Sequence, residues 1–213
     1  MSSKIYPIGI QNFEKIRKDG YFYIDKTALI YKLVKTGSYY FLSRPRRFGK
    51  SLLVSTLDAY FRGKKDLFQG LAMERLEKEW NVYPVLHLDF SMTKYTALSD
   101  LLGQLNLNLY DWEKLYGKEE VEGTPAERFR GVIRRAYEQT GKPVVVLIDE
   151  YDAPLLDSNH LPELQNELRE EMRKFFSPLK AQGEYLRFLF LTGISKFSQM
   201  SIFSELNNLQ NIS

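Results

Sequence analysis

Three consecutive residues, Gly49, Lys50 and Ser51, combine the chemistry that binds phosphate and magnesium at the start of a helix. They follow a short apolar run at 39–42 and open a helical pattern over 49–61. In that setting backbone N–H groups bind phosphate oxygens, the Lys50 ammonium reaches the β- and γ-phosphates, and the Ser51 hydroxyl ligates Mg²⁺. Gly49 lets the backbone approach a phosphate where a Cβ would intrude. The segment therefore predicts a phosphate-binding loop.

The loop departs from the Walker A pattern G-x-x-x-x-G-K-[ST], because Arg44 stands at its first glycine position. Arg46 and Arg47 also stand where small residues are usual. These arginines either widen or stiffen the loop or place guanidinium groups beside the phosphates. The simpler alternative is a strand-to-helix turn with a solvated basic patch. The residues of this segment predicted to contact a nucleotide are Arg46, Arg47, Phe48, Gly49, Lys50, Ser51 and Leu52.

A second motif places two carboxylates after an apolar run, where Asp149 and Glu150 follow residues 144–148. Asp149 is suited to hold the hydration shell of Mg²⁺, and Glu150 to orient and deprotonate a water that attacks the γ-phosphate. The alternative is a strand that enters a solvated acidic turn, with Asp152 adding to its charge. About 100 residues after a Gly-Lys-Ser loop, the catalytic interpretation is favoured.

A third motif follows the apolar run at 186–191, where the chain continues through Thr192 to Ser195 and Lys196. A polar group here would contact the γ-phosphate or the attacking water. Thr192 is the first candidate for that sensor role and Ser195 the second, while Lys196 would neutralise developing charge. The alternative is an ordinary Thr-Gly turn at the end of a strand.

The surrounding elements follow from the spacing of apolar residues. Strands are predicted at 39–42, 85–90, 144–148 and 186–191, and helices at 28–34, 49–61, 96–116, 124–140 and 161–180. Thr124 and Glu127 form a capping signature for the fourth of these helices, and Gly141 ends it. Such alternation predicts an α/β fold of three layers, with a mainly parallel sheet and helices on both faces. Ligands bind at the carboxyl ends of parallel strands, so the three motifs point to one crevice.

The composition narrows the class of protein. The chain has 213 residues, 44% of them hydrophobic, a net charge of +3 and no cysteine. These values exclude a disulfide scaffold and a thiolate metal site, and the charge alone does not argue for nucleic acid. His87 and His160 are too far apart to suggest a metal site, and the arginines of the 124–140 helix are expected on a solvated face. No signal peptide or membrane span is evident, so a cytoplasmic protein is expected.

Four segments together resemble the AAA-ATPase-like family of bacterial and archaeal proteins, in which a PD-(D/E)XK nuclease-like domain often follows the ATPase part. The segments are residues 23–27, 44–51, 147–152 and 191–198. The absence of the first Walker A glycine is itself part of that family's pattern. The resemblance covers nearly the whole chain.

This resemblance implies the ASCE branch of P-loop NTPases, ATP as the nucleotide, and a sensor strand between the loop strand and the acidic strand. It also implies that Ile24 and Tyr23 contact the base, the alternative being ordinary core packing. Asp25 and Lys26 are either a buried pair or a nucleotide contact. The predicted catalytic residues are Glu150, Lys50 and Thr192, with Ser51 and Asp149 as metal ligands.

The leading interpretation is a Mg²⁺-dependent ATPase module coupled to a C-terminal nuclease-like domain or a partner protein. One alternative is an ATP-binding switch with little hydrolysis, and another is a nucleic-acid-binding module that uses the basic loop. Glu150 favours hydrolysis, because a switch has less need of a base. The sequence ends soon after the predicted sensor strand, so residues 1–213 are expected to form a P-loop domain without its lid or a further domain.

Overall fold

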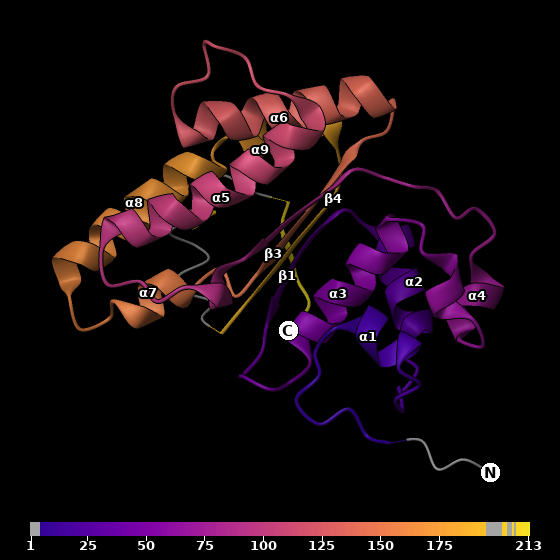
Figure 1. The fold of residues 1–213 in the computed structure, drawn as a ribbon. Helices are drawn as coiled ribbons and strands as arrows, with labels where there is room; N and C mark the ends of the chain where they lie inside the picture. Colours follow the sequence, from indigo (N-terminus) through magenta and orange to yellow (C-terminus); the bar gives the residue numbers. More distant parts are fainter. Residues whose placement is uncertain (1–4, 195–201, 204–205, 207) are drawn as a thin grey trace.

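The computed structural model describes residues 5–194, 202–203, 206 and 208–213, and these form a five-stranded parallel sheet (Figure 1). Its strands are β1 (Tyr39–Ser43), β2 (Val85–Asp89), β3 (Val144–Asp149), β4 (Leu186–Gly193) and β5 (Gln210–Asn211). Their order across the sheet is β2-β3-β4-β1-β5. The strand β4 therefore lies between β1 and β3, the position expected for the sensor strand.

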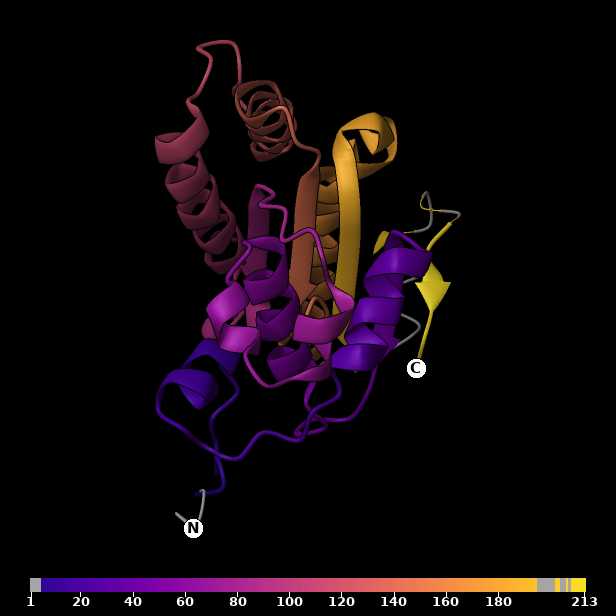
Figure 2. The ribbon, with the colours of Figure 1, turned by 90° about the vertical axis from the view of Figure 1, so that its right-hand side faces the viewer.

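Helices cover both faces of the sheet, which confirms the predicted layers. They are α1 (Phe13–Lys18), α2 (Thr27–Thr36), α3 (Lys50–Phe61), α4 (Ala72–Leu76), α5 (Leu98–Tyr116), α6 (Pro125–Thr140), α7 (Ala153–Asp157), α8 (Pro162–Phe176) and α9 (Pro178–Ala181), with short 3-10 turns η1 (Lys65–Phe68), η2 (Phe90–Met92) and η3 (Gly183–Tyr185). The group α1 to α4 packs on one face and the group α5 to α9 on the other (Figure 1). Figure 2 views the side of α1 to α4, with β5 at one edge of the sheet near the C-terminus.

The central strand β3 shows why the sheet needs two helical layers. Every residue from Val144 to Asp149 is buried. Val145 and Leu147 contact the core under α1 to α4, while Val144, Val146 and Ile148 contact the core under α5 to α9. A strand that is apolar on both faces is stable only when both are covered.

Two predicted helices differ from the structure. The helix expected at 161–180 is two helices, because α8 ends at Phe176 and α9 begins at Pro178. Proline has no backbone N–H to continue the helical hydrogen bonds. The helix expected from residue 96 begins at Leu98, because the Asp100 carboxylate accepts hydrogen bonds from the backbone N–H groups of Thr96 and Ala97.

The arginines of α6 are not all on a solvated face as predicted. Arg135 is buried and forms an ion pair with Glu122 at 2.5 Å, and Arg128 pairs with Glu113 at 2.7 Å. These contacts tie α6 to α5 and to the loop that joins them. The capping prediction for α6 is confirmed, since the Thr124 hydroxyl accepts from Glu127 N while the Glu127 carboxylate accepts from Thr124 N.

Candidate functional site

The carboxyl ends of β1, β3 and β4 are joined by backbone hydrogen bonds. Arg44 N donates to Gly193 O at 3.1 Å, and Tyr151 N donates to Thr192 O at 3.0 Å. A Cβ on Gly193 would lie 2.3 Å from the Tyr151 ring, so only glycine permits this close approach. The loops that carry the three sequence motifs are thus held against one another.

Lys50 is at the centre of this junction. Its side chain is directed inward from the first turn of α3 and is only 3% exposed. Its ammonium donates to Arg44 O at 3.0 Å and Pro45 O at 3.2 Å, and lies 3.0 Å from a Glu150 carboxylate oxygen. Three acceptors match the three N–H bonds of a lysine, so the buried charge is fully satisfied. The structure therefore brings the predicted phosphate loop and the predicted acidic strand end into contact.

Left-handed backbone conformations shape both loops. Gly49, with φ of 76°, stands just before α3, which is a position that glycine occupies without strain. Arg47 has φ of 66° and Glu150 has φ of 51°, and both are unusual for residues that carry a Cβ. Such strain persists only where the surrounding contacts fix it, and it is common at functional sites.

Thr192 is completely buried at the end of β4. Its hydroxyl donates to the Asp149 carboxylate and accepts from Glu150 N at 3.1 Å. Asp149 is itself only 3% exposed. Thr192 therefore orients both acidic residues, which is an indirect role that the sequence prediction of a phosphate contact did not include.

Glu150 combines a half-buried carboxyl group with a cationic partner. Burial raises the pKa of this carboxyl above its ordinary value of 4.5, and the hydrogen bond and charge of Lys50 oppose that shift. A carboxylate with a raised pKa is a better proton acceptor near neutral pH. The chemistry at this position is thus suited to a general base.

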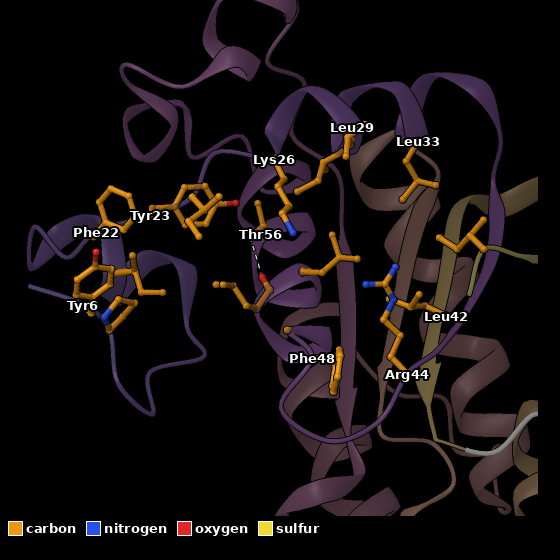
Figure 3. Close-up of a pocket in the computed structure, with 18 residues that line it drawn as sticks. Tyr6, Phe22, Tyr23, Lys26, Leu29, Leu33, Leu42, Arg44, Phe48 and Thr56 are labelled. Carbon is orange, nitrogen blue, oxygen red and sulfur yellow. Dashed lines mark hydrogen bonds between the residues drawn. The ribbon is translucent and has the colours of Figure 1, made fainter.

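Two cavities lie on either side of the loop that begins α3. One has a volume of about 510 Å³, is mostly apolar and is lined by Tyr23, Ile24 and Phe48 (Figure 3). The other has a volume of about 970 Å³ and is lined by polar groups that include Arg46, Arg47, Lys50, Ser51 and Glu150. Pro7, Gly49 and Leu52 line both cavities, so they form the boundary between an apolar and a charged compartment.

The predicted base contacts lie in the apolar cavity. Ile24 is 68% exposed, which excludes ordinary core packing for it, and Tyr23 lies on the cavity wall nearer the core. Asp25 and Lys26 are not a buried pair, since both are exposed. The Asp25 carboxylate instead accepts hydrogen bonds from Thr27 N and Ala72 N and so joins the start of α2 to α4.

Several wall residues of the two cavities were not predicted. Tyr6 and Leu33 contribute to the apolar cavity and Lys94 to the charged one, and none of them stands in a recognisable motif. Asp152, which only the alternative interpretation placed in a solvated turn, is buried, and its carboxylate accepts from Ile194 N at 2.8 Å. The position of Asp152 in the sequence, three residues after a buried strand, does not indicate that its side chain points inward.

The remaining candidates do not form a second site in the part of the chain that the structure describes. Asp89, a carboxylate at the end of the 85–90 strand that the sequence suggests for the same crevice, accepts a hydrogen bond from Ser91 N, and His160 is exposed in a turn. Within the described ranges, no group of three or more His, Asp or Glu side chains is arranged to hold a metal. Ser195 and Lys196 lie outside the described residues.

In open parallel α/β sheets ligands bind outside the carboxyl ends of the strands, and here that end holds a buried lysine and acidic residues. The chain belongs to the AAA-ATPase-like family, whose model, described as "Predicted AAA-ATPase", matches residues 7–203. This match confirms the family named from the sequence motifs.

A curated protein of Azotobacter chroococcum mcd 1, described as an uncharacterized protein in the vnfD 5' region, is 43% identical over 214 residues. The match covers 100% of this chain and 42% of that protein, so the chain spans less than half the length of its relative. No solved structure matches the chain. None of the helices in the described ranges has the length and apolar character to cross a membrane.

Proposed function

We propose that this chain binds ATP with Mg²⁺ and hydrolyses it, as an ATPase module of the ASCE branch of P-loop proteins. The observation that carries the proposal is the 3.0 Å contact between the Lys50 ammonium and the Glu150 carboxylate at the carboxyl edge of the sheet. A phosphate-binding lysine and a base that orients the attacking water both act at the same γ-phosphate, so the two side chains must lie close together. The position of β4 between β1 and β3 supports the same branch.

Each of the two cavities suits a different part of the proposed nucleotide ligand. The apolar cavity of about 510 Å³ suits a base, and the charged cavity suits the phosphates together with the attacking water. The N-terminus of α3, with its free N–H groups and its positive dipole end, faces the charged cavity through Lys50 and Ser51. Gly49 lies at the boundary, where the ligand would pass from one cavity to the other.

The oxygen donors near Lys50 suit magnesium. The Ser51 hydroxyl and the Asp149 carboxylate would hold the ion, and both are hard ligands. Magnesium commonly binds through one or two protein groups together with substrate phosphates, and the ion supplies positive charge to the phosphate oxygens. Thr192 fixes the orientation of the Asp149 carboxylate through its hydroxyl hydrogen bond.

The proposed mechanism requires Lys50 to change partners. A bound phosphate attracts the ammonium that now contacts Glu150, and this leaves the Glu150 carboxylate free to accept a proton from water. The left-handed backbone at Glu150 and the hydrogen bond from Glu150 N to Thr192 hold the residue in place during that exchange. Partial exclusion of solvent strengthens each of these charge interactions.

A calorimetric titration with ATP and Mg²⁺ tests the binding step. Lys50→Ala is expected to weaken ATP binding roughly 10- to 100-fold, the loss typical of a charge-assisted hydrogen bond. Lys142→Ala is a matched control, because Lys142 is exposed, lines neither cavity, and its ammonium donates to Asn81 on the surface. No binding by the wild-type chain would contradict the proposal.

Single-turnover hydrolysis tests the role of Glu150. Glu150→Gln is expected to slow the chemical step about 10²- to 10⁴-fold while ATP still binds. Because the pKa of the Glu150 carboxyl lies above 4.5, the wild-type rate is expected to rise as the pH rises through that raised value and then to level off. An unchanged rate in Glu150→Gln would contradict the assignment of Glu150 as the base, whereas ATP binding with little hydrolysis by the wild-type chain would favour the alternative of an ATP-binding switch.

The nucleic-acid alternative rests on Arg46, Arg47 and Lys94, which line the charged cavity. It predicts binding to single-stranded DNA that falls steeply with salt and survives Lys50→Ala. Coupling of the ATPase to a nuclease-like domain or another partner is also a proposal, supported by the family and by the greater length of the Azotobacter relative.

A further inference from the structure

The arginines of the phosphate loop face different cavities. Arg46 and Arg47 line the charged cavity, whereas Arg44 lines the apolar cavity together with Phe48. Figure 3 shows the Arg44 guanidinium directed toward Leu42 and Leu33, while the Phe48 ring lies toward the backbone end of the Arg44 side chain. The residue at the position of the first Walker A glycine thus extends away from the compartment of Lys50.

The backbone of Arg44 is fixed by the site itself. Its N–H donates to Gly193 O at 3.1 Å, and its carbonyl accepts from the Lys50 ammonium at 3.0 Å. Its side chain, by contrast, is exposed and has no hydrogen bond or ion pair with any residue in the described ranges. The backbone of Arg44 is therefore fixed, while its guanidinium makes no hydrogen bond or ion pair with the described residues and can bind a ligand.

The surroundings of this guanidinium suit a flat apolar ligand. The nearby cavity walls are aliphatic, with Leu29, Leu33 and Leu42 among them, and the Phe48 ring is 63% exposed at the same rim. A guanidinium is planar and weakly hydrated, and it stacks on aromatic faces. An aromatic base in the cavity would bury both the Phe48 ring and the flat face of the guanidinium.

We propose that Arg44 is a base-binding residue, whose guanidinium stacks on the face of the nucleotide base while Phe48 packs beside it. The inference rests on the proposed function, because it assumes a nucleotide with its phosphates at Lys50. The ligand class is a nucleoside triphosphate held by its base as well as by its phosphates. Arg44 and Arg46, two residues apart, then serve opposite ends of one ligand.

Titration with two ligands separates the contribution of Arg44 to base binding from its contribution to phosphate binding. ATP carries a base, and inorganic tripolyphosphate carries only the phosphates, so both are titrated in the presence of Mg²⁺. Arg44→Ala is expected to weaken ATP binding roughly 3- to 30-fold, the range of a cation–π contact, and to leave tripolyphosphate binding unchanged. Arg46→Ala is the matched control and is expected to weaken both ligands by the same factor.

Two further variants sharpen the result. Arg44→Lys keeps the charge without the planar group and is expected to lose part of the ATP affinity. Arg44→Gly introduces the usual Walker A glycine and is expected to behave as Arg44→Ala rather than to improve binding. Equal melting temperatures confirm that the variants fold, as expected for an exposed side chain without partners.

The two titrations can give three results that contradict the inference or the proposed function. Equal weakening of ATP and tripolyphosphate by Arg44→Ala would place the guanidinium at the phosphates and overturn the inference. Unchanged ATP binding would also overturn it, because the side chain would then have no part in the site. Failure of the wild-type chain to bind either ligand would instead overturn the proposed function, and this inference with it.

Discussion

Lys50 shows how one side chain can stabilise the fold and prepare the site. A buried ammonium is costly unless it is paired, and here two carbonyls and a carboxylate satisfy it. The same three contacts hold the loop closed around the position that a phosphate would take. In the proposed mechanism a phosphate would replace the Glu150 carboxylate at Lys50, and this exchange would free the proposed base only when the ligand is bound.

Glu77 is a second buried acidic residue, and its role is structural. Its carboxylate accepts from the Tyr60 hydroxyl at 2.5 Å, from Glu79 N at 2.9 Å and from Lys35 at 2.9 Å. Burial alone would raise the pKa of this carboxyl, but the hydrogen bonds from Tyr60, Glu79 N and Lys35 outweigh it and lower the pKa. Glu77 thus connects α2, α3 and the end of α4.

Glu77→Gln is expected to lower the free energy of unfolding at pH 7 by about 1.5–3 kcal/mol, the contribution of hydrogen bonds to a charged group. Because the folded pKa of Glu77 is lowered, its contribution is present above the ordinary value of 4.5 and is lost as the pH falls through the folded value. Urea unfolding at a series of pH values measures the difference, which should narrow at acidic pH. Glu79→Gln is the control, and a pH-independent loss would contradict this account.

Local patterns picked out residues that the structure brings together at the candidate site, but not the direction of their side chains. Lys50 and Glu150 could be predicted because a phosphate loop and an acidic strand end have recognisable sequences. The orientation of Arg44 into the apolar cavity depends on contacts with β4, which is more than 140 residues away in sequence. The burial of Asp152 depends likewise on the backbone at Ile194.

At the scale of elements, Gly193 fixes the distance between β4 and the turn after β3. A Cβ at this position would lie 2.3 Å from the Tyr151 ring and 2.8 Å from the Asp152 carboxylate. Gly193→Ala is therefore expected to destabilise the protein by about 1–3 kcal/mol, the cost of overpacking a core. It is also expected to displace the end of β4, to which Arg44 N and Glu150 N donate hydrogen bonds.

Gly103 provides the matched comparison, because it lies within α5 and a Cβ there meets no atom within 4 Å. Gly103→Ala is expected to stabilise the protein by up to about 1 kcal/mol through its higher helix propensity. Thermal or urea unfolding of the two variants measures both effects. A loss of stability in Gly103→Ala as large as that in Gly193→Ala would show that the close approach at Gly193 is not the cause.

The strands with continuous apolar runs and the long helices could be predicted, whereas the short helices and β5 could not. The apolar runs of β1, β3 and β4 and the caps of α6 determine their structure locally. By contrast α1, α4, α7 and β5 have two to six residues each, too few for a periodic pattern. Their structure comes from contacts with the rest of the chain, such as those of the Asp25 carboxylate at α4.

At the scale of the molecule, the candidate site lies where the two helical layers meet the sheet edge. The first layer supplies Lys50 from α3, and the sheet supplies Asp149 and Thr192. Because β1, β3 and β4 contribute side chains to both cores, a ligand held at their ends is linked to the whole domain. Ligand binding should therefore stabilise the protein as one unit and not as separate layers.

Thermal unfolding with and without Mg²⁺ and ATP tests this expectation. A ligand present at 100 times its Kd adds about 2.7 kcal/mol of stability, which corresponds to a rise of roughly 5–10 °C in Tm for a domain of this size. A single transition should shift as a whole, less when EDTA removes Mg²⁺. In Lys50→Ala at the same ligand concentration the gain should fall to about 0.4–1.4 kcal/mol, because binding is 10- to 100-fold weaker. The Lys142→Ala control should shift as the wild type does. Two separate transitions, of which only one responds to ATP, would show that the layers unfold independently and that the site belongs to one of them.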